Sequence, residues 1–416
     1  MTYLITKVKV SNGIPLVVKD SICTKGILTT AGSKILQGFV PTYDATAVRL
    51  AKKAGCKVVG KATQDEFGFG TFSTNCAFGV PKNPHDLSRS CGGSSGGVAG
   101  YVAASKSDVF GLGESTGGSI SCPASFCGVV GLTPTYGLVS RYGLIDYASS
   151  LDRIGPITQT VEDAAWLLSK IARYDKQDST SIKKSAEDYT LYCGKSIKGL
   201  KIGVPKEYMD LATKNVRDTV TLAINQLEKL GAKIVPISLK YTDLALPAYY
   251  IIALSEASTN LAKFCGMRYG LQDKLDGNFN TYFSKVRSEG FGEEAKRRIL
   301  LGTFARMAGF QDKYYIKALK IRTLVIEDFQ KTFKKVDVIA APTMPIVAPK
   351  FSEIEKLSPL DQYKIDVLTV PVSLAGLPQL SVPAGFVGKM PVGLHLIANY
   401  LDEGKIIQVG DAFEQS

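Results

Sequence analysis

Small residues are concentrated between positions 90 and 135, where the chain contains Gly92-Gly-Ser-Ser-Gly-Gly97 and Gly117-Gly-Ser-Ile-Ser-Cys-Pro123. Glycine and serine at this density are also typical of flexible linkers. A linker, however, would not alternate with apolar segments such as residues 98–104 and 109–112. Glycine permits positive φ and close approach of backbone segments. We therefore expect buried backbone in tight turns that holds several hydroxyls at fixed positions.

Composition limits the class of protein. With 416 residues and 45% hydrophobic content, the chain can bury a large core as one big domain or two to three average ones. A charged fraction of 21% argues against disorder. The formal net charge of +12 is compatible with a polyanionic partner. Its lysines are scattered and do not alternate with aromatic residues, which favours a solvated basic surface over a nucleic-acid interface.

Several site classes are disfavoured by the sequence. The eight cysteines lack the short paired spacing of a zinc site, and there are only two histidines, so we expect no metal. No P-loop motif occurs, and the Gly111-x-Gly113 pattern lacks the context of a dinucleotide fingerprint. No signal-peptide pattern and no apolar run of membrane-spanning length are visible. We expect a cytoplasmic protein with reduced thiols and no membrane contact.

Helical and strand patterns alternate along the chain. Strands are expected at residues 13–20, 56–60, 200–205, 232–237, 336–342, 376–386 and 393–398. Helices are expected at residues 44–55 with an Asp44 cap, 160–174 with a Thr160/Asp163 capping pair, 213–231, 247–268 and 293–333. This order predicts one α/β domain over residues 1–416, built on a single sheet, with a helical insertion at roughly 243–335.

The serine-rich core offers a nucleophile without an obvious histidine base. His85 and His395 both lie outside it, and no Gly-x-Ser-x-Gly elbow is present, so a Ser-His-Asp triad is disfavoured. Ser119 directly follows Thr116-Gly117-Gly118. Their backbone N–H groups can form an anion-binding nest, worth about 2.7–4 kcal/mol per donor to an oxyanion, although an ordinary glycine turn has the same sequence.

Joint occurrence of separated motifs gives a specific resemblance. The two glycine-serine motifs, preceded by Gly13-Ile-Pro-Leu-Val-Val-Lys19, resemble the amidase signature family. Within that family the chain resembles the A subunits of glutamyl/aspartyl-tRNA amidotransferases through three further segments: Val129-Val-Gly-Leu-Thr-Pro-Thr-Tyr-Gly-Leu-Val-Ser-Arg-Tyr-Gly-Leu144, Ser149-Ser-Leu-Asp-Arg-Ile-Gly-Pro156 and Lys296-Arg-Arg-Ile-Leu-Leu-Gly-Thr-Phe304. The resemblance extends from about residue 13 to the end of the printed sequence.

This resemblance implies a large twisted mixed sheet surrounded by helices and a Ser–cis-Ser–Lys triad. Ser119 would be the nucleophile, Ser94 the bridging serine after a cis peptide bond, and Lys19 the base. Ser95 is the competing bridging serine, and Ser94 is preferred because its offset from Lys19 fits the family pattern. The resemblance also implies the oxyanion role of the three residues before Ser119, and a glutamine site formed by Tyr249, Arg298 and Asp366.

The implied function is hydrolysis of glutamine through a seryl acyl-ester. The ammonia would pass to a partner B subunit that binds tRNA and uses ATP and Mg²⁺, with a C subunit completing the complex and no cofactor in this chain. The alternatives are a stand-alone amidase acting on another small amide and a catalytically silent structural subunit. Ser121 and the pair Glu114-Ser115 depart from the family pattern beside the triad. We also expect the family's helical N-terminal segment to be missing.

Overall fold

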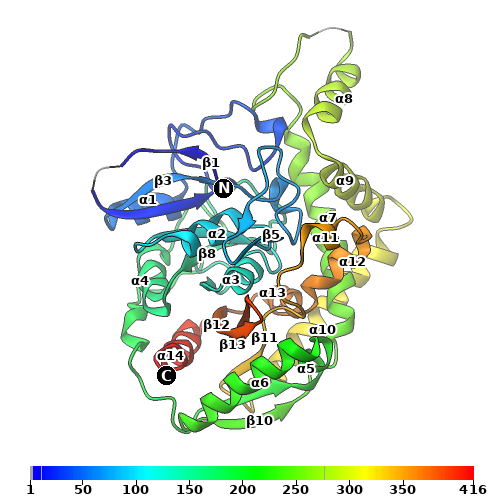
Figure 1. The fold of residues 1–416 in the computed structure, drawn as a ribbon. Coiled ribbons are helices and arrows are strands. Elements are labelled where there is room, and N and C mark those ends of the chain that lie inside the picture. The colour runs from blue at the N-terminus through cyan, green and yellow to red at the C-terminus, as the bar shows by residue number, and fades with distance from the viewer. Residues whose placement is uncertain (1–2, 11, 276) are drawn as a thin grey trace.

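An eleven-stranded mixed sheet forms the centre of the computed structural model, which describes residues 3–10, 12–275 and 277–416 (Figure 1). From edge to edge its strands are β1 (Leu4–Lys7), β3 (Cys56–Ala62), β2 (Ile14–Lys19), β6 (Phe110–Ser115), β8 (Arg153–Thr158), β7 (Val130–Thr133), β12 (Gln379–Val387), β13 (Met390–Ala398), β11 (Val338–Pro342), β9 (Lys201–Pro205) and β10 (Lys233–Ile237). Strand β2 is parallel to both β3 and β6, whereas β8 is antiparallel to β6 and β7. The predicted α/β class with one mixed sheet is confirmed. A two-stranded hairpin, β4 (Lys82–Asn83) and β5 (Asp86–Ser90), lies outside this sheet.

Helices cover both faces of the sheet because its strands are apolar on both sides. Along β2, Leu16 and Val18 pack into one hydrophobic core and Val17 into another, as the alternation of strand side chains requires. The first core is shared with α1 (Thr46–Lys53), α4 (Val161–Ile171), α6 (Lys214–Lys229) and α14 (Glu403–Glu414). The second is shared with α2 (Gly96–Ala104) and α3 (Ser121–Cys127), each of which begins within one of the two glycine-serine motifs.

A largely helical segment connects β10 to β11 and runs along one side of the molecule (Figure 1). It contains α7 (Thr242–Asn260), α8 (Phe279–Gly290), α9 (Glu293–Arg306) and α10 (Lys317–Thr332). Buried residues of α7 share a core with Ile339 and Ala341 of β11, so this segment packs on the sheet. The predicted helical content is present, and its status as an insertion into the domain stays a prediction. The short helices α5 (Lys206–Leu211), α11 (Phe351–Ile354), α12 (Pro359–Lys364) and α13 (Val370–Leu374) lie in the connections.

One of the two predicted helix caps is wrong. Helix α1 begins after Ala45, which makes no side-chain cap. The Asp44 carboxylate instead accepts a hydrogen bond from the Lys25 N–H at 2.8 Å and pairs with Lys52 at 2.8 Å. The other cap is confirmed, because the Thr160 hydroxyl oxygen accepts from the Asp163 N–H at 3.2 Å at the start of α4.

Two further observations concern membrane-spanning helices and the state of the cysteines. Within the described residues, no helix is long and apolar enough to cross a membrane. All eight cysteines lie in the described part of the chain, and each is a free thiol.

Candidate active site

Lys19 ends strand β2 in a fully buried position. Its Nζ atom donates hydrogen bonds to Ser94 Oγ at 2.7 Å, to the Glu114 carbonyl oxygen at 2.9 Å and to Glu114 Oε2 at 2.7 Å. Strands β2 and β6 are parallel neighbours, so their carboxyl ends lie at the same edge of the sheet. That topology brings Lys19 to Glu114, which is 95 residues away in the sequence.

Ser94 and Ser95 lie just before helix α2 and make different contacts. The Gly93–Ser94 peptide bond is cis. A Cβ atom on Gly93 would clash with the Asp65 carboxylate, which explains glycine at this position. The Ser95 hydroxyl donates to the Glu114 carbonyl oxygen at 3.1 Å, whereas Lys19 reaches Ser94. The structure therefore places Ser94 beside the lysine, and the bridging role of Ser94 stays a prediction.

Ser119 lies in the turn between β6 and α3 and is 8% exposed. Its carbonyl oxygen accepts a hydrogen bond from the Ser95 N–H at 3.2 Å, so this turn lies directly beside the serine pair before α2. Gly117 and Gly118 are required by close packing, since an added Cβ would lie 2.9 Å from the Tyr249 hydroxyl or would clash with Thr369. The turn therefore contacts Ser95 on one side and Tyr249 and Thr369 on the other.

Glu114 and Asp152 are two buried carboxyl groups joined by the Thr116 hydroxyl. That oxygen is 3.0 Å from Glu114 Oε1 and 2.7 Å from Asp152 Oδ1. Burial raises the pKa of Asp152 well above its usual range, and the nearby charge of Glu114 raises it further.

Arg298 projects from α9 and is only 3% exposed. Its Nε donates to Glu294 Oε1 at 2.7 Å and its Nη1 donates to the Tyr147 hydroxyl oxygen at 2.8 Å. The guanidinium carbon lies 5.0–5.6 Å from the ring centroids of Phe69, Tyr147, Tyr250 and Tyr363. An aromatic enclosure of this kind holds a cation in a defined position.

Asp366 lies in a 3₁₀ turn, Ile365–Leu368, between α12 and α13. Its Oδ2 accepts hydrogen bonds from the Thr71 hydroxyl at 3.0 Å and the Tyr250 hydroxyl at 3.1 Å. Burial raises its pKa to about 6, although both hydrogen bonds favour the carboxylate. Tyr250 thus connects Asp366 to the Arg298 enclosure, while its neighbour Tyr249 contacts Gly117. The three predicted substrate-binding residues, Tyr249, Arg298 and Asp366, therefore all lie around Tyr250.

Several residues of this region were missed by the sequence analysis. Glu114 was noted only as a departure beside the triad, and its contact with Lys19 was not expected. The contacts of Arg298 and Asp366 add a further group: Thr71, Tyr147, Tyr250, Glu294 and Tyr363. The sequence did contain one signal for Glu114, because it is a carboxylate in a strand that otherwise consists of apolar and small residues.

The second histidine, His395, is buried within the sheet. It lies fully buried in β13, with Nε2 2.8 Å from Gln379 Oε1. Burial lowers its pKa to about 3, so the ring is neutral at pH 7. Among the residues that the structure describes, no three His, Cys, Asp or Glu side chains form a group able to hold a metal ion.

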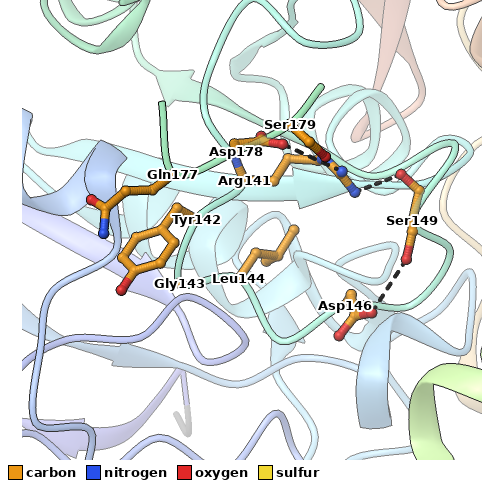
Figure 2. A pocket seen from close by; sticks show the side chains of 9 residues that line it. All are labelled: Arg141, Tyr142, Gly143, Leu144, Asp146, Ser149, Gln177, Asp178 and Ser179. Atoms are coloured by element: carbon orange, nitrogen blue, oxygen red, sulfur yellow. Dashed lines mark hydrogen bonds and ion pairs between the residues drawn. The ribbon is translucent and has the colours of Figure 1, made fainter. Parts of the chain in front are cut away.

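A surface hollow of about 290 Å³ lies apart from these residues, and Figure 2 shows the side chains around it. Its arginine is already engaged, because Arg141 Nη1 donates to the Ser149 carbonyl oxygen at 2.5 Å and Nη2 pairs with Asp178 at 3.6 Å. None of the predicted catalytic or substrate-binding residues lines this hollow.

Comparison of this chain with models of known protein families identifies its family. A family model described as Amidase matches residues 6–407. The chain belongs to the amidase family. Curated relatives of this amidase include the A subunits of two glutamyl-tRNA(Gln) amidotransferases. One, from Heliobacterium modesticaldum, is 50% identical and the other, from Caldanaerobacter subterraneus, is 51% identical, each over 405 residues that cover 97% of this chain and 83% of the relative.

Solved amidase structures have the same fold. The A subunit of the glutamyl-tRNA(Gln) amidotransferase from Thermotoga maritima superposes with a TM-score of 0.86 at 38% identity, covering 100% of this amidase and 87% of that chain. A peptide amidase from Stenotrophomonas maltophilia superposes with a TM-score of 0.80 at 31% identity, covering 97% and 82%. The expected amidase-signature architecture is confirmed.

Proposed function

We propose that this amidase is the glutamine-hydrolysing A subunit of a tRNA-dependent amidotransferase. The names of the relatives that are 50–51% identical over almost the whole chain support this function. The ammonia released from glutamine would convert Glu-tRNA(Gln) to Gln-tRNA(Gln), Asp-tRNA(Asn) to Asn-tRNA(Asn), or both.

In the proposed reaction Ser119 Oγ attacks the side-chain amide carbon of glutamine. Its proton passes to Ser94, and Ser94 passes its own proton towards Lys19. The same path returns a proton to the leaving nitrogen, so that ammonia departs and a glutamyl ester of Ser119 remains. Water then hydrolyses this ester to glutamate. The 2.7 Å hydrogen bond between Lys19 and Ser94 supports the second transfer.

We assign stabilisation of the oxyanion to the backbone N–H groups of Thr116, Gly117 and Gly118. Donors fixed before the reaction stabilise developing charge without reorganisation, at about 2.7–4 kcal/mol for each donor. The close contacts of Gly117 with Tyr249 and of Gly118 with Thr369 hold this turn rigid, which such a site needs.

Recognition of the amino-acid end of glutamine is assigned to Arg298, Asp366 and Tyr249. A guanidinium pairs with the α-carboxylate and a carboxylate pairs with the α-ammonium. The observation that carries the proposal is the position of the turn before α3. Through Ser95 it adjoins Ser94 and Lys19, and through Tyr249 it adjoins the cluster that contains Arg298 and Asp366.

The remaining steps are assigned to partners. We propose that a B subunit binds tRNA and activates the mischarged ester with ATP and Mg²⁺, and that a C subunit completes a cytoplasmic complex. The net charge of +12 is compatible with tRNA nearby.

The test is ammonia release from glutamine by the wild type and by Ser119→Ala, each with and without B and C subunits. Activity that requires Ser119 and rises with the partners supports the proposal. Activity on unrelated amides with none on glutamine would identify a stand-alone amidase. A stable complex without activity in any combination would identify a structural subunit.

A further inference from the structure

The buried ion pair between Lys19 and Glu114 has a consequence for the proton path. The side chains are 0% and 3% exposed, and Nζ lies 2.7 Å from Oε2. An ammonium group has three protons, and Lys19 directs hydrogen bonds to three acceptors, Ser94 Oγ and two oxygens of Glu114. In this arrangement Lys19 has no free lone pair, so it cannot take a proton from Ser94 unless it releases one.

We propose that Glu114 receives the proton that leaves Ser119, with Lys19 passing it on. This inference rests on the proposed hydrolysis at Ser119. Since Glu114 acts through Lys19 and touches neither substrate nor nucleophile, it is a positioning residue that also stores a proton.

The transfers balance without any further reactant. As the Ser119 oxygen bonds to the amide carbon, its proton moves to Ser94 Oγ, the Ser94 proton moves to Lys19 Nζ, and a proton on Nζ moves to Glu114 Oε2. The result is a tetrahedral adduct with an unchanged ammonium and a neutral Glu114 carboxyl group. On collapse of the adduct, Glu114 returns its proton to Lys19, Lys19 returns one to Ser94, and Ser94 passes its own proton to the amide nitrogen. The C–N bond then breaks, ammonia leaves, and the Glu114 carboxylate is restored.

The surroundings favour this role for Glu114. Three ionisable groups interact electrostatically with the pair: Asp65 with Lys19, and Asp152 and Arg153 with Glu114. Burial and the nearby charge of Glu114 raise the pKa of Asp152 well above its usual range. The Thr116 hydroxyl lies 3.0 Å from Glu114 Oε1 and donates to that oxygen, which fixes the carboxylate while Oε2 faces Lys19.

The test is the pH–rate profile of glutamine hydrolysis by the full complex, for the wild type and Glu114→Gln. Without the carboxylate, no acceptor beside Lys19 can take its proton, so Lys19 must first lose one to solvent before it can accept the proton of Ser94. We expect the acidic limb of kcat/KM to move to higher pH by at least about one unit, with activity about tenfold lower at neutral pH and recovered at alkaline pH. A limb that stays in place, or that moves to lower pH, would overturn the proposal.

Three further variants separate the possible failures. Glu403→Gln alters another fully buried glutamate, whose Oε1 accepts the Thr135 N–H, and should leave the profile unchanged. Glu114→Ser, which leaves room for water, gives the same test if Glu114→Gln does not fold. If Ser119→Ala hydrolyses glutamine as fast as the wild type, the proposed function is wrong. If hydrolysis requires Ser119 but the acidic limb of Glu114→Gln does not move, only the proposed role of Glu114 is wrong.

Discussion

The Tyr250 hydroxyl donates a hydrogen bond to Asp366 Oδ2 at 3.1 Å while its ring packs 5.6 Å from the guanidinium carbon of Arg298. One side chain therefore connects Arg298, which we assign to the α-carboxylate of glutamine, with Asp366, which we assign to its α-ammonium. Since Tyr250 has no charge of its own, its contribution is to fix the positions of the two charges.

Tyr250→Phe should raise the KM for glutamine about tenfold and leave kcat within a few-fold. It removes one hydrogen bond to a charged group, an interaction worth about 1.5–3 kcal/mol. Steady-state ammonia release measures both constants. Tyr400→Phe, at a tyrosine that is 52% exposed, provides the control and should not alter KM.

Arg298→Lys should raise the KM for glutamine by at least about tenfold. A lysine has no planar fork for a carboxylate, and it cannot keep the paired contacts with Glu294 and Tyr147. Arg297→Lys alters the adjacent arginine of α9, whose side chain is 42% exposed, and should change KM less than about twofold. Equal effects of the two substitutions would contradict the assignment.

Glutamine binding should weaken as the pH falls through about 6. The pKa of Asp366 is raised to about 6 by burial, so the group is a carboxylate above this pH and a neutral acid below it. The neutral acid does not attract an α-ammonium, and KM should rise about tenfold for each unit below pH 6. Asp366→Asn should give a high KM at every pH, and a retained pH dependence in this variant would assign the titration to another group.

Ser94→Ala should lower kcat at least a hundredfold, because it removes the hydroxyl that contacts Lys19 and that we assign to the proton path from Ser119. Ser95→Ala is the matched control. Its hydroxyl donates to the Glu114 carbonyl oxygen, so its loss should cost less than about tenfold. The opposite order would make Ser95 the bridging residue.

Gly118→Ala should lower the free energy of unfolding by about 1–3 kcal/mol and lower kcat, because the new methyl group would overlap the Thr369 side chain. Thermal and urea unfolding measure the first effect. Adding Thr369→Ala removes the nearest atom, the Thr369 hydroxyl oxygen, together with its methyl group, and should restore part of the lost stability. No recovery in the double variant would show that the overlap with Thr369 does not set the cost.

The regular elements that the sequence analysis placed depend on local periodicity and caps, but strands β1, β6, β7 and β8 and helices α2 and α3 were not predicted. Strand β2 and helix α6 fall within about two residues of their expected bounds. The prediction of an Asp44 cap was wrong because the Lys25 backbone N–H and the Lys52 ammonium group both bind that carboxylate. Competition of this kind depends on tertiary contacts that a local pattern does not contain.

The site was predictable only where a family motif marked it. Lys19, Ser94 and Ser119 lie in such motifs, and their catalytic roles remain predictions. The contact between Glu114 and Lys19 depends on the parallel pairing of β2 with β6, which spans 95 residues. Tyr250 was passed over in favour of Tyr249, because two adjacent tyrosines on a helix give no indication of which neighbour each one faces.

The proposed bond-breaking residues all come from the first 119 positions, whereas the proposed amino-acid site comes from residues 249–366. The turn before α3 contacts the second set through Tyr249 and Thr369. Changes in α7, α9 and the segment around Asp366 that keep Tyr249 and Thr369 would therefore alter which amide is chosen and leave its cleavage intact. Selectivity in a protein built this way can evolve separately from reactivity, and grafting these later segments between family members is a direct route to new amide substrates.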